Sequence, residues 1–169
     1  MKKMLSCGVI LAISLLLTGY LSAAEYKDQA ELANYLAGAP VTLEQGLTAS
    51  EPQGRPISGK FEVEDNVFQL SVYTAKGGKY REVIVDGKTG KIAKSEILKG
   101  ADDLKDAKAQ SAAMAKAKIT LRAAVEKAVA ANPGFRSAAA IPALEKGKPV
   151  ATVTLVKGTQ FKTEKERLD

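Results

Sequence analysis

Two hydrophobic patterns follow one another along the chain, and each predicts a different secondary structure. Residues 28–40 and 42–50 show the 3.6-residue spacing of short amphipathic helices, and Thr42 and Gln45 are spaced as a capping box. From residue 61 the period changes to two, with apolar residues at Phe61, Val63, Phe68, Leu70, Val72, Val83 and Val85. Turn sequences at Gly77–Gly78 and at 86–90 separate the runs. This first half predicts helices followed by a meander of antiparallel strands.

The second half repeats this order. Thr120 is placed to cap a helix that ends at the sequence NPG, and residues 135–169 alternate as three strands and two turns. When the halves are overlaid, "VTLEQGL" lies over "ITLRAAV", "PQGR" over "PGFR" and "NVFQLSVY" over "PVATVTLV". We therefore expect an α+β protein with two tandem units, each a helix packed on a small antiparallel sheet.

Residues 99–118, between the halves, are rich in alanine and lysine, and Leu104 and Met114 are too few large apolar residues for a stripe. This composition predicts a solvated helical connector between two separate cores, and hence the first site of limited proteolysis. The second unit lacks the final hairpin of the first. Its closing "KTEKERLD" predicts either a charged edge strand or a frayed tail.

The N-terminus predicts a signal peptide over residues 1–24. Lys2 and Lys3 precede the apolar stretch 9–17, and "SAA" places small residues before Glu25. We expect cleavage there, a periplasmic or secreted product, and no stable membrane span after cleavage.

Composition narrows the chemistry. The chain has no histidine, and its one cysteine, Cys7, lies in the predicted signal peptide. Serine–histidine and cysteine–histidine catalysis and histidine- or cysteine-based metal sites are thereby excluded. The net charge is +6, but basic and acidic residues are interspersed and the chain has no tryptophan. We therefore expect no nucleic-acid-binding surface. "GRPISGKF" has phosphate-loop glycine spacing, but Phe61 replaces the required hydroxyl residue. We expect no enzyme activity, metal or cofactor.

The helix start [IV]-T-L, the turn at NPG and the hairpin "VIVDGKTGKI" resemble the PepSY domain, over about residues 41–99 and 119–169. The resemblance implies a tandem PepSY-like protein with repeat 1 at 41–98 and repeat 2 at 119–169, preceded by an N-terminal helix at 25–40. It also implies a protein-binding function at the cell envelope, with a peptidase as one candidate partner to be inhibited or modulated.

The turn residues Asp86, Gly87, Thr89 and Gly90 are expected to be structural. Asp86 can accept hydrogen bonds from nearby amides, and the two glycines tolerate positive φ.

Alternation also predicts a contact face. If Phe68, Leu70 and Val72 point to the helix, then Tyr73, Tyr80 and Ile84 point away from it, as a low-polarity binding surface. The alternative is that this face packs against the other repeat, or against the N-terminal helix through Leu32 and Leu36.

Two other functions stay open at the level of sequence. Asp102, Asp103 and Asp106 cluster in the connector and could bind a cation, although they lack the pattern of a calcium loop and also fit a solvated charge run. The protein could also be a structural component of the envelope.

Overall fold

The computed structural model describes residues 23–169, so the predicted signal peptide lies outside the described residues except for Ala23 and Ala24. The helical elements are α1 (Ala23–Gly38), α2 (Leu43–Ser50), the 3-10 turn η1 (Glu51–Gln53), α3 (Ala101–Ala115) and α4 (Leu121–Ala130). The Thr42–Gln45 capping box and the Thr120 N-cap are confirmed. The first helix begins upstream of the predicted position 28. Within residues 23–169, no helix is both long and apolar enough to cross a membrane.

The strands form one antiparallel sheet rather than two. They are β1 (Arg55–Glu64), β2 (Val67–Lys76), β3 (Lys79–Asp86), β4 (Ile92–Ile97), β5 (Arg136–Glu145), β6 (Lys148–Lys157) and β7 (Gln160–Arg167). The sheet order is β4-β3-β2-β1-β5-β6-β7, so the class is α+β as expected. β1 and β5 join the halves through the pairs Gly59–Ala140 and Lys60–Ala139. The buried apolar residues of both halves form a single cluster, so the expectation of two separate cores is wrong.

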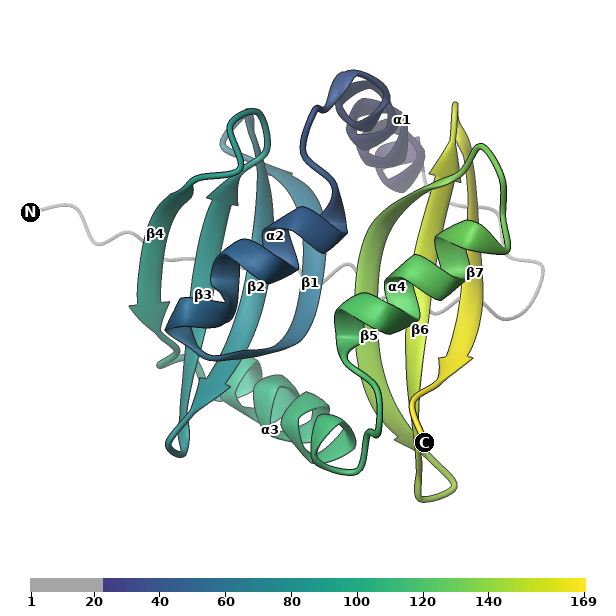
Figure 1. The fold of residues 1–169 in the computed structure, drawn as a ribbon. Helices are drawn as coiled ribbons and strands as arrows, with labels where there is room; N and C mark the ends of the chain where they lie inside the picture. Colours follow the sequence, from purple (N-terminus) through teal and green to yellow (C-terminus); the bar gives the residue numbers. More distant parts are fainter. Residues whose placement is uncertain (1–22) are drawn as a thin grey trace, which may run out of the picture.

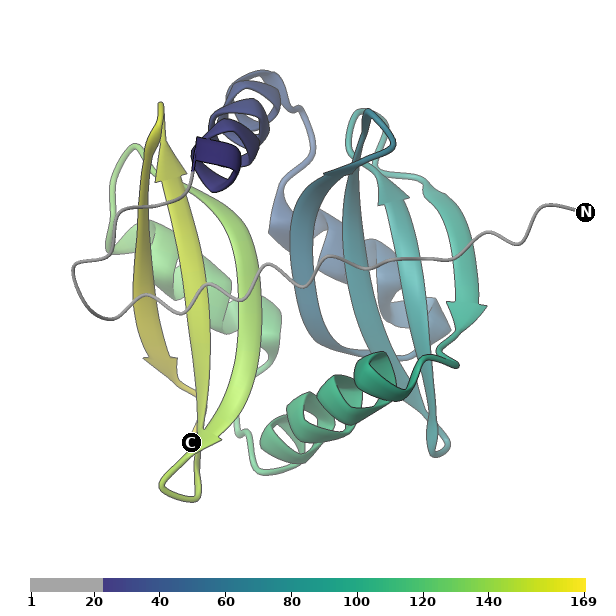
Figure 2. The same ribbon diagram turned by 180° about the vertical axis from the view of Figure 1, so that it is seen from behind.

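The helices lie on both sides of the sheet. α2 and α4 lie across the front face (Figure 1), and α1 and α3 lie on the side seen from behind (Figure 2). On the front, Leu43 and Leu47 of α2 pack above Gly59, where a Cβ atom would come within 3.1 Å of both leucines. Gly46 lies directly over Leu70. α2 thus covers the centre of the front face of the first half, although it is short.

The strand bounds recur along the chain with a constant spacing. β5, β6 and β7 begin and end 81 residues after β1, β2 and β3. Each half carries a register irregularity at the same place, between Pro56 and Ser58 in β1 and between Ser137 and Ala139 in β5. Gly59 pairs with Ala140, the residue 81 positions later. An approximate two-fold axis therefore passes through this pair.

The expectation that residues 99–118 are a solvated connector is wrong. α3 is helical, but Ala107, Ala113 and Met114 are buried. Gln110 of α3 accepts a hydrogen bond from Ser58 Oγ of β1 at 2.7 Å. Small alanine side chains let this helix lie close to β1 and β5 without a stripe of large apolar residues.

The end of the second half is ordered. β7 is an edge strand of the sheet, and Leu168 after it is fully buried. The Leu168 N–H donates to the Pro149 carbonyl, and its own carbonyl accepts from the N–H of Lys118. Of the two alternatives for "KTEKERLD", the charged edge strand is the one observed. No strand after β7 corresponds to β4 within the described residues.

One arginine ties α1 to the second half of the sheet. Arg136 donates from Nη1 to the Leu36 carbonyl at 2.6 Å and from Nη2 to the Val41 carbonyl at 3.2 Å. The first bond adds a charged donor to a carbonyl in the last turn of α1, and the second holds the segment between α1 and α2. Arg55, 81 residues earlier, is exposed.

We expect Arg136→Met to lower the free energy of unfolding by about 1–3 kcal/mol, because methionine keeps the unbranched stem but leaves the two carbonyls without their charged donor. Arg55→Met is the matched control and should change it by less than about 0.5 kcal/mol. Chemical denaturation of both variants measures the difference. Equal effects would mean that the two bonds add nothing to stability.

Candidate functional site

The turn between β3 and β4 is built around Asp86. Its Oδ1 accepts from the N–H of Lys88 (3.0 Å), the N–H of Thr89 (2.7 Å) and Thr89 Oγ1 (2.9 Å). The bonds from Thr89 and then that from Lys88 hold the pKa of Asp86 below its usual value. All three donors to Oδ1 come from the turn itself, so these bonds serve the hairpin.

The two turn glycines have different reasons to be glycine. Gly90 has a φ of 70°, as expected, in the left-handed region that side chains disfavour. Gly87 does not have a positive φ, so that part of the expectation is wrong. A Cβ atom on Gly87 would instead come within 2.4 Å of the Phe68 ring. Phe68 stacks on Phe61 and on Tyr35 of α1, so Gly87 makes room for an aromatic cluster.

The predicted contact residues do lie on one face, the back of the sheet. The register pairs Tyr73 with Glu82, Ala75 with Tyr80, and Ser71 with Ile84, all on the side opposite α2. All three predicted residues are half-buried. The Tyr73 hydroxyl donates to Asp103 Oδ1 of α3 at 3.1 Å, so α3 covers this side chain. The sequence alternative named the other repeat or the N-terminal helix as the cover, whereas this helix lies in the predicted connector.

Glu82 is the central residue of this face, and the sequence analysis overlooked it. It lies between Tyr80 and Ile84 on the same side of β3, and its Oε1 accepts from Ser71 Oγ at 2.6 Å. Burial raises the pKa of Glu82, the bond from Ser71 opposes this, and Glu62 raises it further. The same alternation that placed Ile84 outward applies to Glu82, so the signal was available. The face is therefore polar rather than apolar.

Charged side chains surround Glu82 on this surface, which we call the acidic face. Its members, taken from the registers of β1 to β4, are Lys60, Glu62, Glu64, Glu82, Lys94 and Glu96. Lys60 pairs with Glu62 at 2.6 Å, and Lys94 pairs with Glu96 at 3.0 Å. Four carboxylates and two ammonium groups leave the acidic face net negative, on a chain whose net charge is +6.

The aspartates considered for cation binding lie at the start of α3. Asp103 accepts from Tyr73, which makes it a packing partner of the sheet. Among residues 23–169, no group of three acidic side chains is arranged to hold a metal ion.

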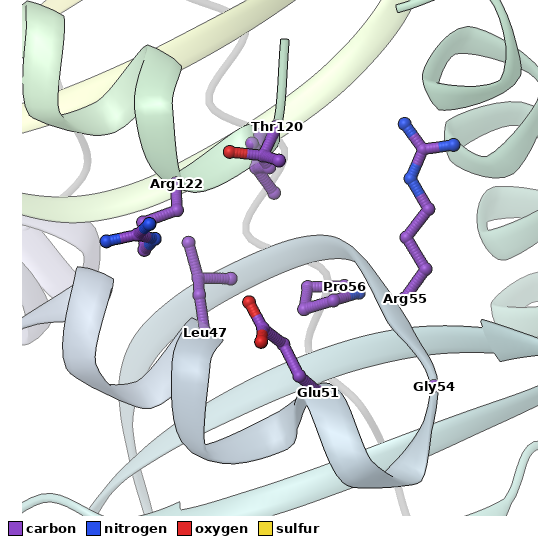
Figure 3. A pocket seen from close by; sticks show the side chains of 8 residues that line it. Leu47, Glu51, Gly54, Arg55, Pro56, Thr120 and Arg122 are labelled. Carbon is purple, nitrogen blue, oxygen red and sulfur yellow. The ribbon is translucent and has the colours of Figure 1, made fainter.

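A cavity of about 230 Å³ lies on the front side, where the two halves meet. It is lined by Leu47, Glu51, Gly54, Arg55, Pro56, Thr120, Leu121 and Arg122. Arg55 and Arg122 stand on opposite sides of Glu51 (Figure 3). A second cavity of about 190 Å³ lies beside Leu36 and Arg136. Both are smaller than the roughly 300–1,000 Å³ of typical small-molecule sites. The phosphate-loop-like segment contributes no phosphate cradle, since Arg55–Lys60 is strand β1.

Comparisons with known proteins place the chain in no family. No family model matches it. No curated protein matches it. Among solved structures, a Clostridium difficile 630 protein described as a "putative lipoprotein" is similar with a TM-score of 0.36 and 14% identity, covering 68% of this chain and 84% of that one. A TM-score this low does not define a shared fold, so the function is argued from the residues.

Proposed function

We propose that this protein is an exported, non-enzymatic module of two tandem PepSY-like repeats that binds a protein partner in the cell envelope, with a peptidase as the partner to test first. The constant 81-residue spacing of the strands supports the tandem arrangement. The order of the helices also favours a longer repeat that includes one more helix. In the first half α1 precedes α2, and in the second half α3 precedes α4 in the same way. In both helix pairs the last buried large residue, Leu36 or Met114, accepts from the amide three residues later.

The acidic face is the observation that carries the binding proposal. Its charged residues lie on β1, β3 and β4 of the first half, on the side opposite the front that α2 covers. Its equivalent in the second half is different, because Thr163 occupies the place of Glu82 and Lys165 that of Ile84. Two halves with the same strand framework thus present different surfaces, as expected if one surface binds a partner.

Glu82 defines the kind of partner. Its carboxylate is half-buried and has a single hydrogen-bond donor, Ser71, among the described residues. A partly desolvated carboxylate gains most from a cation that approaches from the open side. The partner should therefore present lysine or arginine side chains, with Tyr80 and Ile84 supplying the apolar contact beside them.

Glu82→Gln tests this surface without unfolding the protein. Because folding raises the pKa of Glu82, the native state holds its proton more tightly than the unfolded state does, and ionisation on raising the pH costs stability. Glutamine keeps the acceptor for Ser71 and removes the charge. The melting temperature at neutral pH should thus stay the same or rise by roughly 2–4 °C, while partner binding weakens at least about tenfold.

The partner is captured with a photo-crosslinking residue at Ile84 in the native envelope. The matched control places the same residue at Lys165, the equivalent position in the second half. We expect adducts from position 84 only, lost in the Glu82→Gln background. If the captured protein is a peptidase, its activity is measured with and without the purified chain. Equal adducts at both positions, or adducts unchanged by Glu82→Gln, would remove the acidic face as the binding site.

A further inference from the structure

The outer edge of the sheet at β4 is unlike the edge at β7. β7 is mostly half-buried, and its Lys165 and Glu166 already form ion pairs with Glu145 of β5 and Lys127 of α4. β4 is mostly exposed, with Ile92 at 38% and Ile97 at 43% exposure. The two charges of β4, Lys94 and Glu96, are opposite in sign and share the back face of the sheet.

The hydrogen-bond pattern shows which backbone groups of β4 face outward. The Leu98 N–H donates to the Tyr80 carbonyl at 3.0 Å, so Leu98 points its backbone groups at β3. In an antiparallel ladder every second residue does so, which includes Glu96 and Lys94. Ser95 and Ile97 therefore present their N–H and C=O groups to the outer side, because β4 is the outermost strand of the sheet that residues 23–169 form (Figure 1).

We propose that β4 pairs with β4 of a second copy of this chain, antiparallel, about a two-fold axis at Ser95. With the axis there, Ser95 exchanges backbone hydrogen bonds with its own copy. The residue opposite Ile97 would be Ala93, the extra residue of a β-bulge between Ile92 and Lys94, so the regular ladder ends there. Lys94 then lies directly opposite Glu96 of the copy, in the close non-hydrogen-bonded position, and this contact occurs twice. In this dimer the sheets of the two copies form one continuous sheet. The front faces, which α2 and α4 cover, lie on the same side of it in both copies.

Charge selects this register over its neighbours. In a symmetric pair, facing residues must lie on the same face of the sheet, so the register changes in steps of two. An axis at Lys94 would place Lys94 opposite its own copy, and an axis at Glu96 would do the same with glutamate. Of these three axes, only the one at Ser95 avoids both like-charge pairs. It places Lys94 of each copy opposite Glu96 of the other. The regular edge of β4 spans only residues 94–97, because the bulge lies at Ala93, so the interface is small and the dimer should be micromolar rather than nanomolar.

Sedimentation of the purified full chain tests the proposal. We expect a reversible monomer–dimer equilibrium, and Lys94→Glu or Glu96→Lys alone should weaken it at least about tenfold because each places like charges opposite one another. The double variant, with both reversals, should restore dimerisation. Lys165→Glu on β7 is the matched control and should leave the equilibrium unchanged. A chain that stays monomeric up to about 100 µM, or dimers unaffected by the single reversals, would overturn the proposal.

Disulfide trapping locates the axis. In a hydrogen-bonded antiparallel pair the Cα atoms are about 5.5 Å apart, a distance that a disulfide spans. With Cys7 changed to serine, so that no other thiol is present, Ser95→Cys should form a covalent dimer on mild oxidation. Ile97→Cys should not, because each such residue faces Ala93 of the copy. Efficient trapping at position 97 instead of 95 would contradict the register. The proposal does not depend on a protein partner at the acidic face, and its failure would leave the binding proposal untouched.

Discussion

Gly46→Ala is expected to lower the free energy of unfolding by about 1–3 kcal/mol, although alanine is the better helix former by about 1 kcal/mol. A Cβ atom at Gly46 would come within 1.9 Å of Leu70 Cδ2 and 3.1 Å of its Cγ. Leu70 is fully buried, so its side chain can move away only by displacing its neighbours in the core. Thermal or chemical denaturation measures the loss.

The second half suggests how to rescue this variant. The equivalent positions there are Ala124 of α4, four residues after its N-cap as Gly46 is after Thr42, and Ala151 of β6, 81 residues after Leu70; both are fully buried. Adding Leu70→Ala to Gly46→Ala recreates that alanine pair in the first half. The double variant should therefore be more stable than the sum of the two single losses predicts. Strict additivity of the two losses would mean that Gly46 and Leu70 do not constrain each other.

Met114→Ala is expected to cost about 2–5 kcal/mol, the range for truncating a buried methionine. Met114 lies at the end of α3 with 1% of its surface exposed. The same substitution in a solvated connector would cost almost nothing. Leu104→Ala, on the same helix but only half-buried, is the matched control and should cost clearly less.

Proteolysis gives an independent measurement of α3. In the native chain this segment should resist cleavage, because the protease needs an unfolded stretch and α3 is packed on the sheet. Met114→Ala should make cleavage within 99–118 faster. Two results together would contradict the packed helix: rapid cleavage of α3 in the unmodified protein, and no change in the free energy of unfolding for Met114→Ala. They would support the expectation that residues 99–118 are a solvated connector.

Local structure was predictable from the sequence because it depends on nearby residues. The two-residue alternation located β1, β2, β3 and β4, and Gly77 and Gly78 adopt the positive φ that their turn requires. The pairing of β1 with β5 was not predictable, since it rests on two residue pairs about 80 positions apart. The sequence overlay of the strands was also misplaced. It set Asn66 over Pro149, whereas the structural spacing sets Asn66 over Gly147.

Burial in this protein depends on small residues, which carry a weak sequence signal. α3 reaches the sheet through Ala107 and Ala113, so it resembles a solvated helix in composition. Gly46 is a weak helix former within α2, yet its missing Cβ atom lets α2 lie close to Leu70 of β2. For the candidate site, the faces of Tyr80 and Ile84 followed from alternation. The desolvation of Glu82 did not, because it depends on how its neighbours pack around it.

The join between β1 and β5 also affects the order of synthesis. β1 spans Arg55–Glu64, and the strand that covers its outer edge, β5, does not begin until residue 136. A chain that emerges from its N-terminus can fold α2 and β1 to β4 early, while β1 stays an open edge until β5 follows. During that interval the ten-residue β1 is available to other nascent chains, which is a route to misassembly. A pause before residue 136 would prolong this exposure, since α3, made just ahead of β5, contacts the back face of β1 through Gln110 and does not pair with its edge.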